Sequence, residues 1–324
     1  MKRLICFLGI LILFHQVSGQ GPAIEGCDIF PSDHIWNTPV DNLPVHARSD
    51  EYISSIGSST SLHPDFGAGT WNGSPIGIPF NIVGKSQAKK VVTFDYASES
   101  DPGPYPIPDN PLIEGGPDST GDRHILIIDR DNCILYELYK ARPQPDETWL
   151  CGSGAIFPLD SYTLRPDGWT SADAAGLPIL PGLARCDEAD SGEIRHALRF
   201  TAQRTRRHYV WPARHYASSI TDENVPPMGQ RFRLKAGFDV SGYSPQVQTI
   251  LKAMKKYGII LADNGSNWYI SGVPDEAWIS TLVDEFRTVK GSDFEAVDCS
   301  SLMIDPDSGK ARQAQPDGNG WSVF

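Results

Sequence analysis

The chain has 324 residues, of which 40% are hydrophobic and 21% charged, and its formal net charge is −12 at pH 7. This acidic balance excludes nucleic acid as an expected partner, because phosphate binding depends on clustered Lys and Arg. The length suffices for one large or two small domains with a substantial core.

The first residues have the pattern of a secretory signal peptide. Lys2 and Arg3 form a positive start, an apolar run follows over residues 4–14, and small residues precede a cleavage site near Gly19. The run is too short to span a membrane, and no later stretch approaches the roughly 20 apolar residues that a spanning helix needs. We expect residues 1–19 to be removed and the mature protein to be secreted, extracellular or periplasmic, without membrane insertion.

Short β-rich runs, separated by scattered Gly and Pro, follow one another along the chain. They lie at residues 89–97, 123–130, 133–141, 193–202, 230–240 and 267–272. Many short strands between turn residues are typical of all-β domains. The fold class we predict is mainly β, a jelly-roll-like β-sandwich with two or three peripheral helices.

Three helices are expected beside these strands. The first covers residues 49–56. The second begins at Pro245 after the N-cap Ser244, follows helical spacing of apolar residues and ends at Gly258. The third begins at Pro274. We expect a single β-rich domain over residues 20–298 and a flexible polar tail over residues 299–324.

The run 193–202 (EIRHALRFTA) carries a histidine on a candidate strand. Because side chains alternate along a strand, His196 would share a face with Leu198 and Phe200, while Arg195 and Arg199 would lie on the other. We predict a catalytic role for His196 on the floor of a cleft and a substrate-binding role for Arg195. The alternative is a core histidine that hydrogen-bonds a neighbour.

Asp122 and His124 precede the strand at 123–130 and are further catalytic candidates, because polar residues at a strand entrance lie at the rim of a sandwich. The alternative is a turn with a surface ion pair. Asp129, Asp131 and Asn132 are a weak signal for structural calcium, since a complete EF-hand loop needs more oxygen ligands and a Gly at its sixth position. Otherwise we expect no cofactor and no metal.

Residues 206–219 (RRHYVWPARHYASS) gather Arg, His and Tyr in an acidic chain. Cleavage of a uronic-acid polymer by β-elimination needs a group that neutralises the carboxylate, a base and an acid, and these three residue types suit those roles. Adjacent strand residues face opposite sides, so neither Arg-His-Tyr triplet can act as a unit. We predict that Arg214 binds the carboxylate and that His215 and Tyr216 transfer protons. The alternative is a hairpin with exposed charges.

The turn at residues 263–267 (DNGSN) is followed by an aromatic pair. Asp263, Asn264 and Trp268 are candidate sugar contacts, because sugar faces stack on aromatic rings and amides bind hydroxyls; Trp169, in a long loop packed over the sheet, joins them. The alternative is a plain hairpin and a core Trp. Hydrolysis would instead use two carboxylates. The candidates are Asp95, Glu99, Asp101, Glu114, Asp122, Asp173, Glu188, Glu193 and Asp263, and the sequence does not choose a pair.

Several segments together resemble a family of exported bacterial proteins whose activity is uncharacterised. The matching motifs include GDRHILIIDRDN, DGWTSADAAGLPILPGL, GEIRHALRFT and YGIILADNGSNWYISG, and the resemblance covers residues 29–297. Proteins of this look occur beside polysaccharide-degrading enzymes, which is an association rather than a mechanism. The resemblance therefore implies no catalytic residues.

Five cysteines lie outside the expected signal peptide, and some of them should form disulfides in an oxidising compartment. The proteins that this chain resembles carry Ala or a similar residue at position 151 and Tyr at position 186. This chain has Cys151 and Cys186 instead. This paired departure implies a Cys151–Cys186 disulfide, which leaves Cys27 to pair with Cys133 and Cys299 free.

These features favour an exported carbohydrate-active protein that cleaves an extracellular acidic polysaccharide by β-elimination or hydrolysis. The alternative is a non-catalytic carbohydrate-binding or surface-interaction domain, in which the same aromatic residues would bind sugar and the histidines would be structural. A polysaccharide or another extracellular glycan is the expected partner in both cases.

Overall fold

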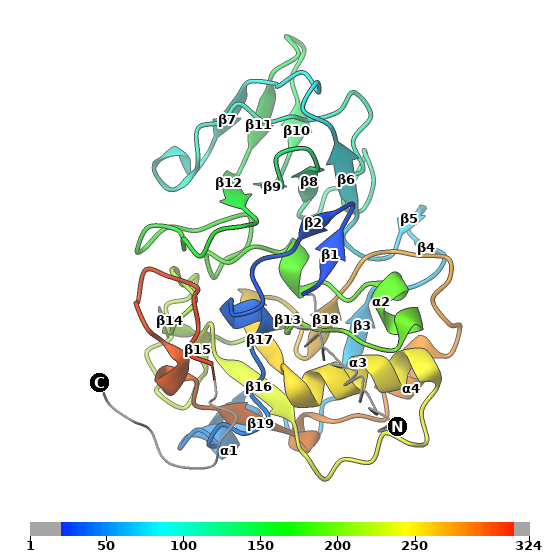
Figure 1. The fold of residues 1–324 in the computed structure, drawn as a ribbon, viewed down its shortest axis with the longest axis vertical. Helices are drawn as coiled ribbons and strands as arrows, with labels where there is room; N and C mark the ends of the chain where they lie inside the picture. Colours follow the sequence, from blue (N-terminus) through cyan, green and yellow to red (C-terminus); the bar gives the residue numbers. More distant parts are fainter. Residues whose placement is uncertain (1–20, 314–324) are drawn as a thin grey trace, which may run out of the picture.

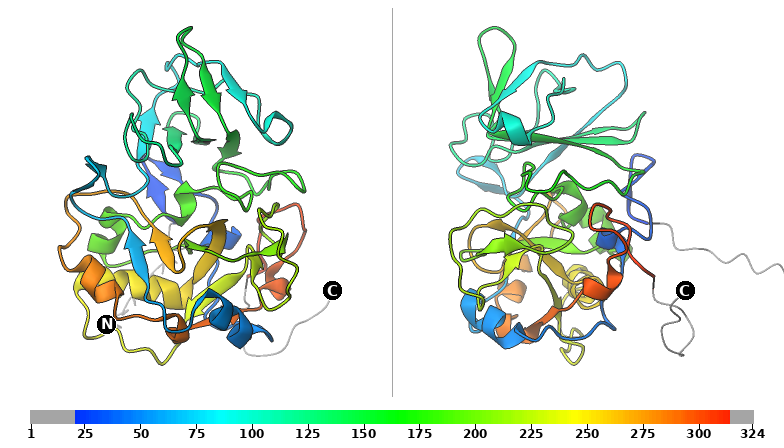
Figure 2. Two further views of the ribbon diagram at one scale, coloured as in Figure 1. Left: turned by 180° about the vertical axis from the view of Figure 1, so that it is seen from behind. Right: turned by 90° about the vertical axis from the view of Figure 1, so that its left-hand side faces the viewer.

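Two lobes stacked one above the other make up the protein (Figures 1 and 2). The structure is a computed structural model and describes residues 21–313, so the expected signal peptide and the end of the polar tail lie outside the described residues. The chain is mainly β, with several sheets and four α-helices in its described part, as the sequence predicts for a β-sandwich with few helices.

The upper lobe is built on a four-stranded sheet in the order β12-β9-β8-β6. Its strands are β6 (Phe80–Val83), β8 (Ile125–Asp129), β9 (Ile134–Tyr139) and β12 (Ser153–Pro158). A smaller sheet joins it, formed by β7 (Val92–Phe94), β10 (Arg142–Pro143) and β11 (Trp149–Cys151). The runs predicted as strands at 89–97, 123–130 and 133–141 supply β7, β8 and β9.

The lower lobe is built on a six-stranded sheet in the order β19-β16-β17-β13-β18-β3. The strands are β3 (His63–Asp65), β13 (Leu198–Ala202), β16 (Arg231–Leu234), β17 (Ile259–Asn264), β18 (Tyr269–Ser271) and β19 (Phe294–Val297). The pairs β13–β17 and β18–β3 are parallel and the other three are antiparallel, so the sheet is mixed.

Three short two-stranded ladders complete the β-structure of the described residues. They pair β1 (Ala23–Ile24) with β2 (Cys27–Asp28), β4 (Thr70–Trp71) with β5 (Ser74–Pro75), and β14 (Arg206–Tyr209) with β15 (Pro227–Met228).

The helices lie around the lower sheet (Figure 1). They are α1 (Ser49–Ile56), α2 (Cys186–Ser191), α3 (Pro245–Lys256) and α4 (Leu282–Phe286). The first and second expected helices are confirmed as α1 and α3. The third is shorter than predicted, because the chain after Pro274 forms turns: the Asp275 carboxylate accepts the N–H of Ala277, and the Gln246 side chain accepts that of Ile279. The sequence analysis missed α2.

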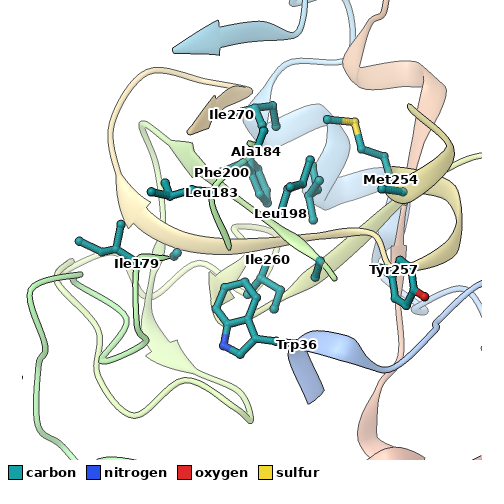
Figure 3. Close-up of a cluster of buried hydrophobic side chains, with 14 of the residues drawn as sticks. Trp36, Ile179, Leu183, Ala184, Leu198, Phe200, Met254, Tyr257, Ile260 and Ile270 are labelled. Atoms are coloured by element: carbon teal, nitrogen blue, oxygen red, sulfur yellow. The ribbon is translucent and has the colours of Figure 1, made fainter. Parts of the chain in front are cut away.

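The two lobes share a hydrophobic core. Leu198 and Phe200 of β13 point into it on the side of Met254 of α3, whereas Ile260 of β17, which pairs with Arg199, lies on the other face of the sheet near Trp36 (Figure 3). The same cluster continues into the upper sheet through Leu126, Ile128 and Leu135. At roughly 25 cal/mol per Å² of buried apolar surface, this continuous burial is the main stabilising contribution to the fold and fixes one lobe against the other.

Within residues 21–313 there is one disulfide, and it ties the N-terminal segment to the turn between β8 and β9. Cys27 and Cys133 are bonded, as implied above, and Cys299 is free. The implied Cys151–Cys186 bridge is wrong: both thiols are free and buried, one in the upper lobe on β11 and the other in the lower lobe on α2.

The segment after residue 298 does not behave as a loose tail in its described part. The N–H of Gly309 donates to the carbonyl of Tyr162, and the N–H of Ala311 donates to that of Asp33. The ordered body therefore extends to residue 313. None of the helices in the described range of 21–313 is long and apolar enough to cross a membrane.

Candidate functional site

A polar cavity of about 350 Å³ lies where the upper lobe meets the sheet of the lower lobe. Asp263 and Asn264 of β17 line it from below, and Asp122 and Tyr139 line it from the upper lobe. The segment 170–174 and His215 close its sides. Four of the residues predicted as a site, Asp122, His215, Asp263 and Asn264, therefore meet in one cavity.

A β-bulge sets the direction of the Asp263 side chain. Leu261 pairs with Phe200, but the next register pair is Asp263 with Thr201, so Ala262 is an extra residue in β17. In a regular strand Asp263 would point to the same face as Leu261, into the core. The bulge turns it to the opposite face, which Thr201 and Arg199 share. Bulges of this kind occur next to active sites, where they redirect a side chain.

The bulge also attaches the segment that closes the cavity. The carbonyl of Ala262 accepts the N–H of Ala175. Gly176 follows with a φ of +70°, and a Cβ there would lie 2.5 Å from the carbonyl oxygen of Trp169. Only glycine fits this close approach. The DGWTSADAAG motif thus folds back onto β17 and brings Asp173 to the cavity.

Asp173 and Arg199 form a buried ion pair beneath Asp263. Arg199 Nε donates to Asp173 Oδ2 at 3.0 Å, and Nη2 donates to Oδ1 at 2.9 Å. Arg199 Nη1 also donates to the hydroxyl of Ser271. Asp263 Oδ2 lies 3.9 Å from Nη2, outside hydrogen-bond range. The guanidinium is therefore hydrogen-bonded to Asp173, and Asp263 interacts with it through charge alone at 3.9 Å.

This arrangement favours a protonated Asp263. Burial raises its pKa, the negative charge of Asp173 raises it further, and the pKa reaches about 8 against the opposing charges of Arg199 and His124. At neutral pH the group is therefore a carboxylic acid facing a cavity. A carboxyl group kept neutral in this way is a proton donor, as general acids are.

Glu99 and His215 lie on the wall of the same cavity. His215 Nδ1 is 2.8 Å from the carbonyl of Ala174, so this nitrogen carries the proton and donates. His215 Nε2 lies 3.8 Å from Glu99 Oε2, and the same oxygen accepts the N–H of Thr170. Glu99 is thus a second carboxylate held by the protein in the cavity that contains Asp263.

The cavity has aromatic and amide groups but no Arg or Lys among its described lining residues. Tyr96 and Tyr139 contribute rings, and the Asn264 side chain is held by the hydroxyl of Thr205. Burial raises the pKa of Tyr139, and the charge of Asp122 raises it further. Tyr139 is therefore a neutral ring with a hydroxyl group, and with Tyr96 beside it the lining suits a polar uncharged ligand.

His124 lies behind the cavity, and both of its ring nitrogens are hydrogen-bonded within the protein. Its Nδ1 is 2.6 Å from Glu114 Oε2, and its Nε2 is 3.1 Å from the carbonyl of Ala172, so both nitrogens donate. Burial opposes the charged form, but the charge and hydrogen bond of Glu114 prevail and raise the pKa of His124 to about 9. The structure thus places His124 as a buried cation that supports residues 172–173.

Two further candidates lie away from the cavity. His196 precedes β13 and is buried on the side of α2, where its Nε2 is 3.0 Å from Glu188 Oε2. It does not meet His215. Arg195 pairs with Glu193 at 2.8 Å on the surface. The predicted alternation is right for Leu198, Arg199 and Phe200, but the strand begins too late to include the histidine.

The arginine and the Trp chosen for sugar binding are structural. Arg214 is buried and donates to the carbonyls of Arg165 and Pro306 and to the Asp307 carboxylate, so no donor is left directed at the cavity. Trp268 is fully buried, stacks on Phe200 at 5.5 Å between ring centroids and donates to the carbonyl of Gly57.

Tyr216 and Trp169 lie near the cavity without lining it. The Tyr216 ring stacks on that of His215 with 5.8 Å between centroids, and its hydroxyl accepts from Arg207. Trp169 packs against the guanidinium of Arg165 at 5.5 Å. Both residues therefore support the wall of the cavity from behind.

The carboxylates considered for calcium are engaged in a turn. Asp129 accepts the N–H groups of Asp131 and Asn132 and the side-chain amide of Asn132. Asp131 accepts the N–H of Lys85. No group of three or more His, Cys, Asp or Glu in the described residues has the arrangement of a metal site.

Sequence reasoning missed Arg199 and Tyr139 as site residues and could not choose Glu99 and Asp173 from nine carboxylates. The only signal for Asp173 was its position in a long, ordered loop. Comparison of the sequence with protein-family models, with curated proteins and with solved structures gives no match.

Proposed function

We propose that this chain is an exported carbohydrate-active hydrolase whose acid–base site is the cavity around Asp263. The observation that carries the proposal is the pair of carboxyl groups in one cavity with different environments. Both accept a backbone N–H bond, but burial and the charge of Asp173 raise the pKa of Asp263 to about 8, while Glu99 faces His215. Glycoside hydrolysis requires such a pair, one acid and one base or nucleophile.

In this proposal Asp263 donates its proton to the glycosidic oxygen as the bond to the anomeric carbon breaks. A water molecule attacks the anomeric carbon and loses its proton to Glu99, or Glu99 attacks first and water then releases the sugar. In both routes one water is added across one glycosidic bond. The configuration of the product distinguishes the two routes, because one inverts and the other retains the anomeric centre.

The charge of the cavity favours hydrolysis over elimination. Elimination on a uronic acid needs a cation to neutralise the substrate carboxylate. The described lining carries carboxyl groups and no Arg or Lys, and the nearby Arg199 is bound by Asp173. An anionic sugar would meet repulsion there, so we propose a neutral glycan as substrate.

Export is part of the proposal. The pattern of the first 19 residues supports it, and so does the Cys27–Cys133 disulfide, since structural disulfides persist in oxidising compartments. The second candidate function is a non-catalytic glycan-binding domain. The observation that favours it is the structural use of His196 and His124, both held by buried carboxylates.

The proposal is tested with a panel of polysaccharides that includes neutral and uronic-acid polymers. Reducing ends measure hydrolysis, and the ultraviolet absorbance of unsaturated uronates measures elimination. We expect reducing ends from a neutral glycan, without new absorbance, and a loss of at least about 100-fold in rate for Asp263→Asn. Asp118→Asn, an exposed residue outside the lining of the cavity, is the matched control and should keep full activity. New absorbance on a uronic-acid polymer, or equal rates for the two variants, contradicts the proposal.

A further inference from the structure

A second cavity lies on the same face of the lower sheet as the Asp263 cavity. Its volume is about 680 Å³, and it lies over β3 and β18. Tyr269 pairs with Thr201 on one side and with His63 on the other, and Thr201 pairs with Asp263. Residues paired across strands point to the same face, so Asp263, Tyr269 and His63 lie in one row across the sheet.

The two cavities are neighbours but not one space. Three strand spacings separate Asp263 from His63, on the order of 14 Å at about 4.8 Å each. The turn 265–267 covers the sheet between them, where the Thr201 hydroxyl donates to the carbonyl of Ser266. Glu114 lines the second cavity and holds His124, whose other nitrogen donates to Ala172 in the wall of the first.

The second cavity has aromatic surfaces of unusual exposure. Trp71, near the tip of the β4–β5 hairpin, lines it and is 73% exposed, the highest exposure among the described large hydrophobic side chains. The His63 and Tyr269 rings on its floor lie 4.2 Å apart and tilt by 32°. Burial lowers the pKa of His63, so this ring is neutral at neutral pH. An exposed ring beside a cavity whose floor carries two further rings is suited to bind a ligand that stacks on aromatic surfaces.

Polar groups stand beside these rings. Asp65 lies on the cavity and makes no side-chain hydrogen bond to any of the described residues. Glu114 and Arg287 line the cavity as well. Rings with a few fixed acceptors and donors suit a ligand with an apolar face and hydroxyl edges. A pyranose has this combination, whereas an aliphatic ligand would leave the carboxylates desolvated without partners.

We infer that this cavity is a second carbohydrate-binding site, in which Trp71 stacks on a sugar ring of the glycan whose cleavage is proposed at Asp263. The class of ligand rests on the proposed function, but the site itself does not take part in the chemistry. Because the two cavities lie side by side on one sheet face, a chain of several sugar units spans both. The second site would then position a polymer for cleavage.

The hairpin that carries Trp71 is itself anchored to the body of the protein, and this helps Trp71 to hold a ligand. The Ser74 hydroxyl donates to the carbonyl of Gly115, and Glu276 accepts the N–H of Gly69. These two bonds fasten both ends of the hairpin to different segments. The tryptophan is thus presented by an anchored ladder, which lowers the entropy lost on binding.

The test measures binding of cellohexaose, xylohexaose and mannohexaose by calorimetry, with Asp263→Asn as the background so that no substrate is consumed. We expect one of these probes to bind and Trp71→Ala to weaken it by about tenfold or more, as for other aromatic anchors. Trp71 is exposed, so this variant should fold. Ile304→Ala, which removes another exposed hydrophobic side chain, is the control and should leave the affinity unchanged.

Each result decides the inference. Equal affinity of Trp71→Ala and the background, or no binding of any probe, overturns it. Self-association of the protein that disappears in Trp71→Ala also overturns it, because the exposed ring would then serve a second copy. Hydrolysis by the wild type without an effect of Trp71→Ala removes the second site and keeps the proposed function. Binding that depends on Trp71 without hydrolysis removes the proposed function and keeps the site.

Discussion

Arg199 holds Asp173 with two parallel hydrogen bonds of 3.0 and 2.9 Å, and both residues are buried. This pair lies beside Asp263. Burial raises the pKa of Asp263, the charge of Asp173 raises it further, and the pKa reaches about 8 although Arg199 opposes the change. The buried pair thus contributes to the protonation of a group in the cavity.

Replacement of Asp173 tests this relationship. In Asp173→Asn the repulsion disappears and Arg199 is left to attract Asp263, so the pKa of Asp263 should fall by at least about one unit. If Asp263 is the general acid, the basic limb of the pH–rate profile moves to lower pH by the same amount. Asp118→Asn should leave the limb in place. If the basic limb of the pH–rate profile of Asp173→Asn stays at the wild-type pH, the ionisation of Asp263 does not control the rate.

The same variant should be less stable. Removal of one partner of a buried ion pair leaves the other without compensation and typically costs about 3–5 kcal/mol in the free energy of unfolding. Renewed pairing of Arg199 with Asp263 would recover part of this, so we expect about 3 kcal/mol at pH 7. Urea unfolding followed by circular dichroism measures it, and a loss below about 1 kcal/mol would contradict the buried pair.

The pair of His124 and Glu114 predicts a pH dependence of stability. The folded pKa of His124 is raised to about 9 from 6.5, so its contribution is complete below pH 6.5 and disappears as the pH rises through 9. Glu114→Gln should therefore lose about 3 kcal/mol at pH 6, and its difference from the wild type should shrink toward pH 9. A difference that stays constant over this range would exclude the ion pair as its source.

The disulfide should contribute more to the free energy of unfolding than the free thiols do. Cys27 and Cys133 close a loop with a sequence separation of 106 residues. Loop-closure entropy for that length gives about 4.7 kcal/mol. The Cys27→Ser/Cys133→Ser double variant should lose this amount in denaturant unfolding, whereas Cys299→Ser should lose less than about 1 kcal/mol. If the double variant and Cys299→Ser lose similar amounts of unfolding free energy, the disulfide is not a principal stabilising cross-link.

Trp268 and Trp71 should differ in their contribution to stability. Trp268 is fully buried between aromatic rings, so Trp268→Ala should cost about 3–5 kcal/mol in stability through the cavity it leaves. Trp71→Ala should leave the unfolding free energy within about 0.5 kcal/mol, because the side chain is 73% exposed. Thermal unfolding of both variants measures this contrast, and a stable Trp268→Ala would contradict the core assignment.

Much of the fold follows from local patterns. The helices at 49–56 and after Pro245 are confirmed because the spacing of apolar residues is a property of the segment itself, although neither N-cap side chain makes a capping hydrogen bond. The strands at 125–129 and 134–139 are likewise apolar runs between turns. The third expected helix is shorter than predicted because the Asp275 and Gln246 side chains accept hydrogen bonds from backbone N–H groups in the turns after Pro274. Tertiary partners of this kind do not show in the spacing of apolar residues.

The site depends on contacts that no local pattern contains. Asp263 was a candidate for its turn signature, but its direction is set by a bulge opposite Thr201, and a register shift appears only when both strands are known. The histidines were chosen by residue type. His196 and His124 prove to be paired with carboxylates eight and ten residues away, in positions the sequence alone does not link to a cavity.

Titration of the Asp263 carboxyl by carbon-detected NMR, assigned by comparison with Asp263→Asn, tests the central claim most directly. The account predicts that the carboxyl carbon resonance shifts with a midpoint near pH 8, so that the group is mostly protonated at pH 7. A midpoint near pH 4, the ordinary value for an aspartate, would mean that the cavity holds an ionised Asp263 and contradicts its role as the acid.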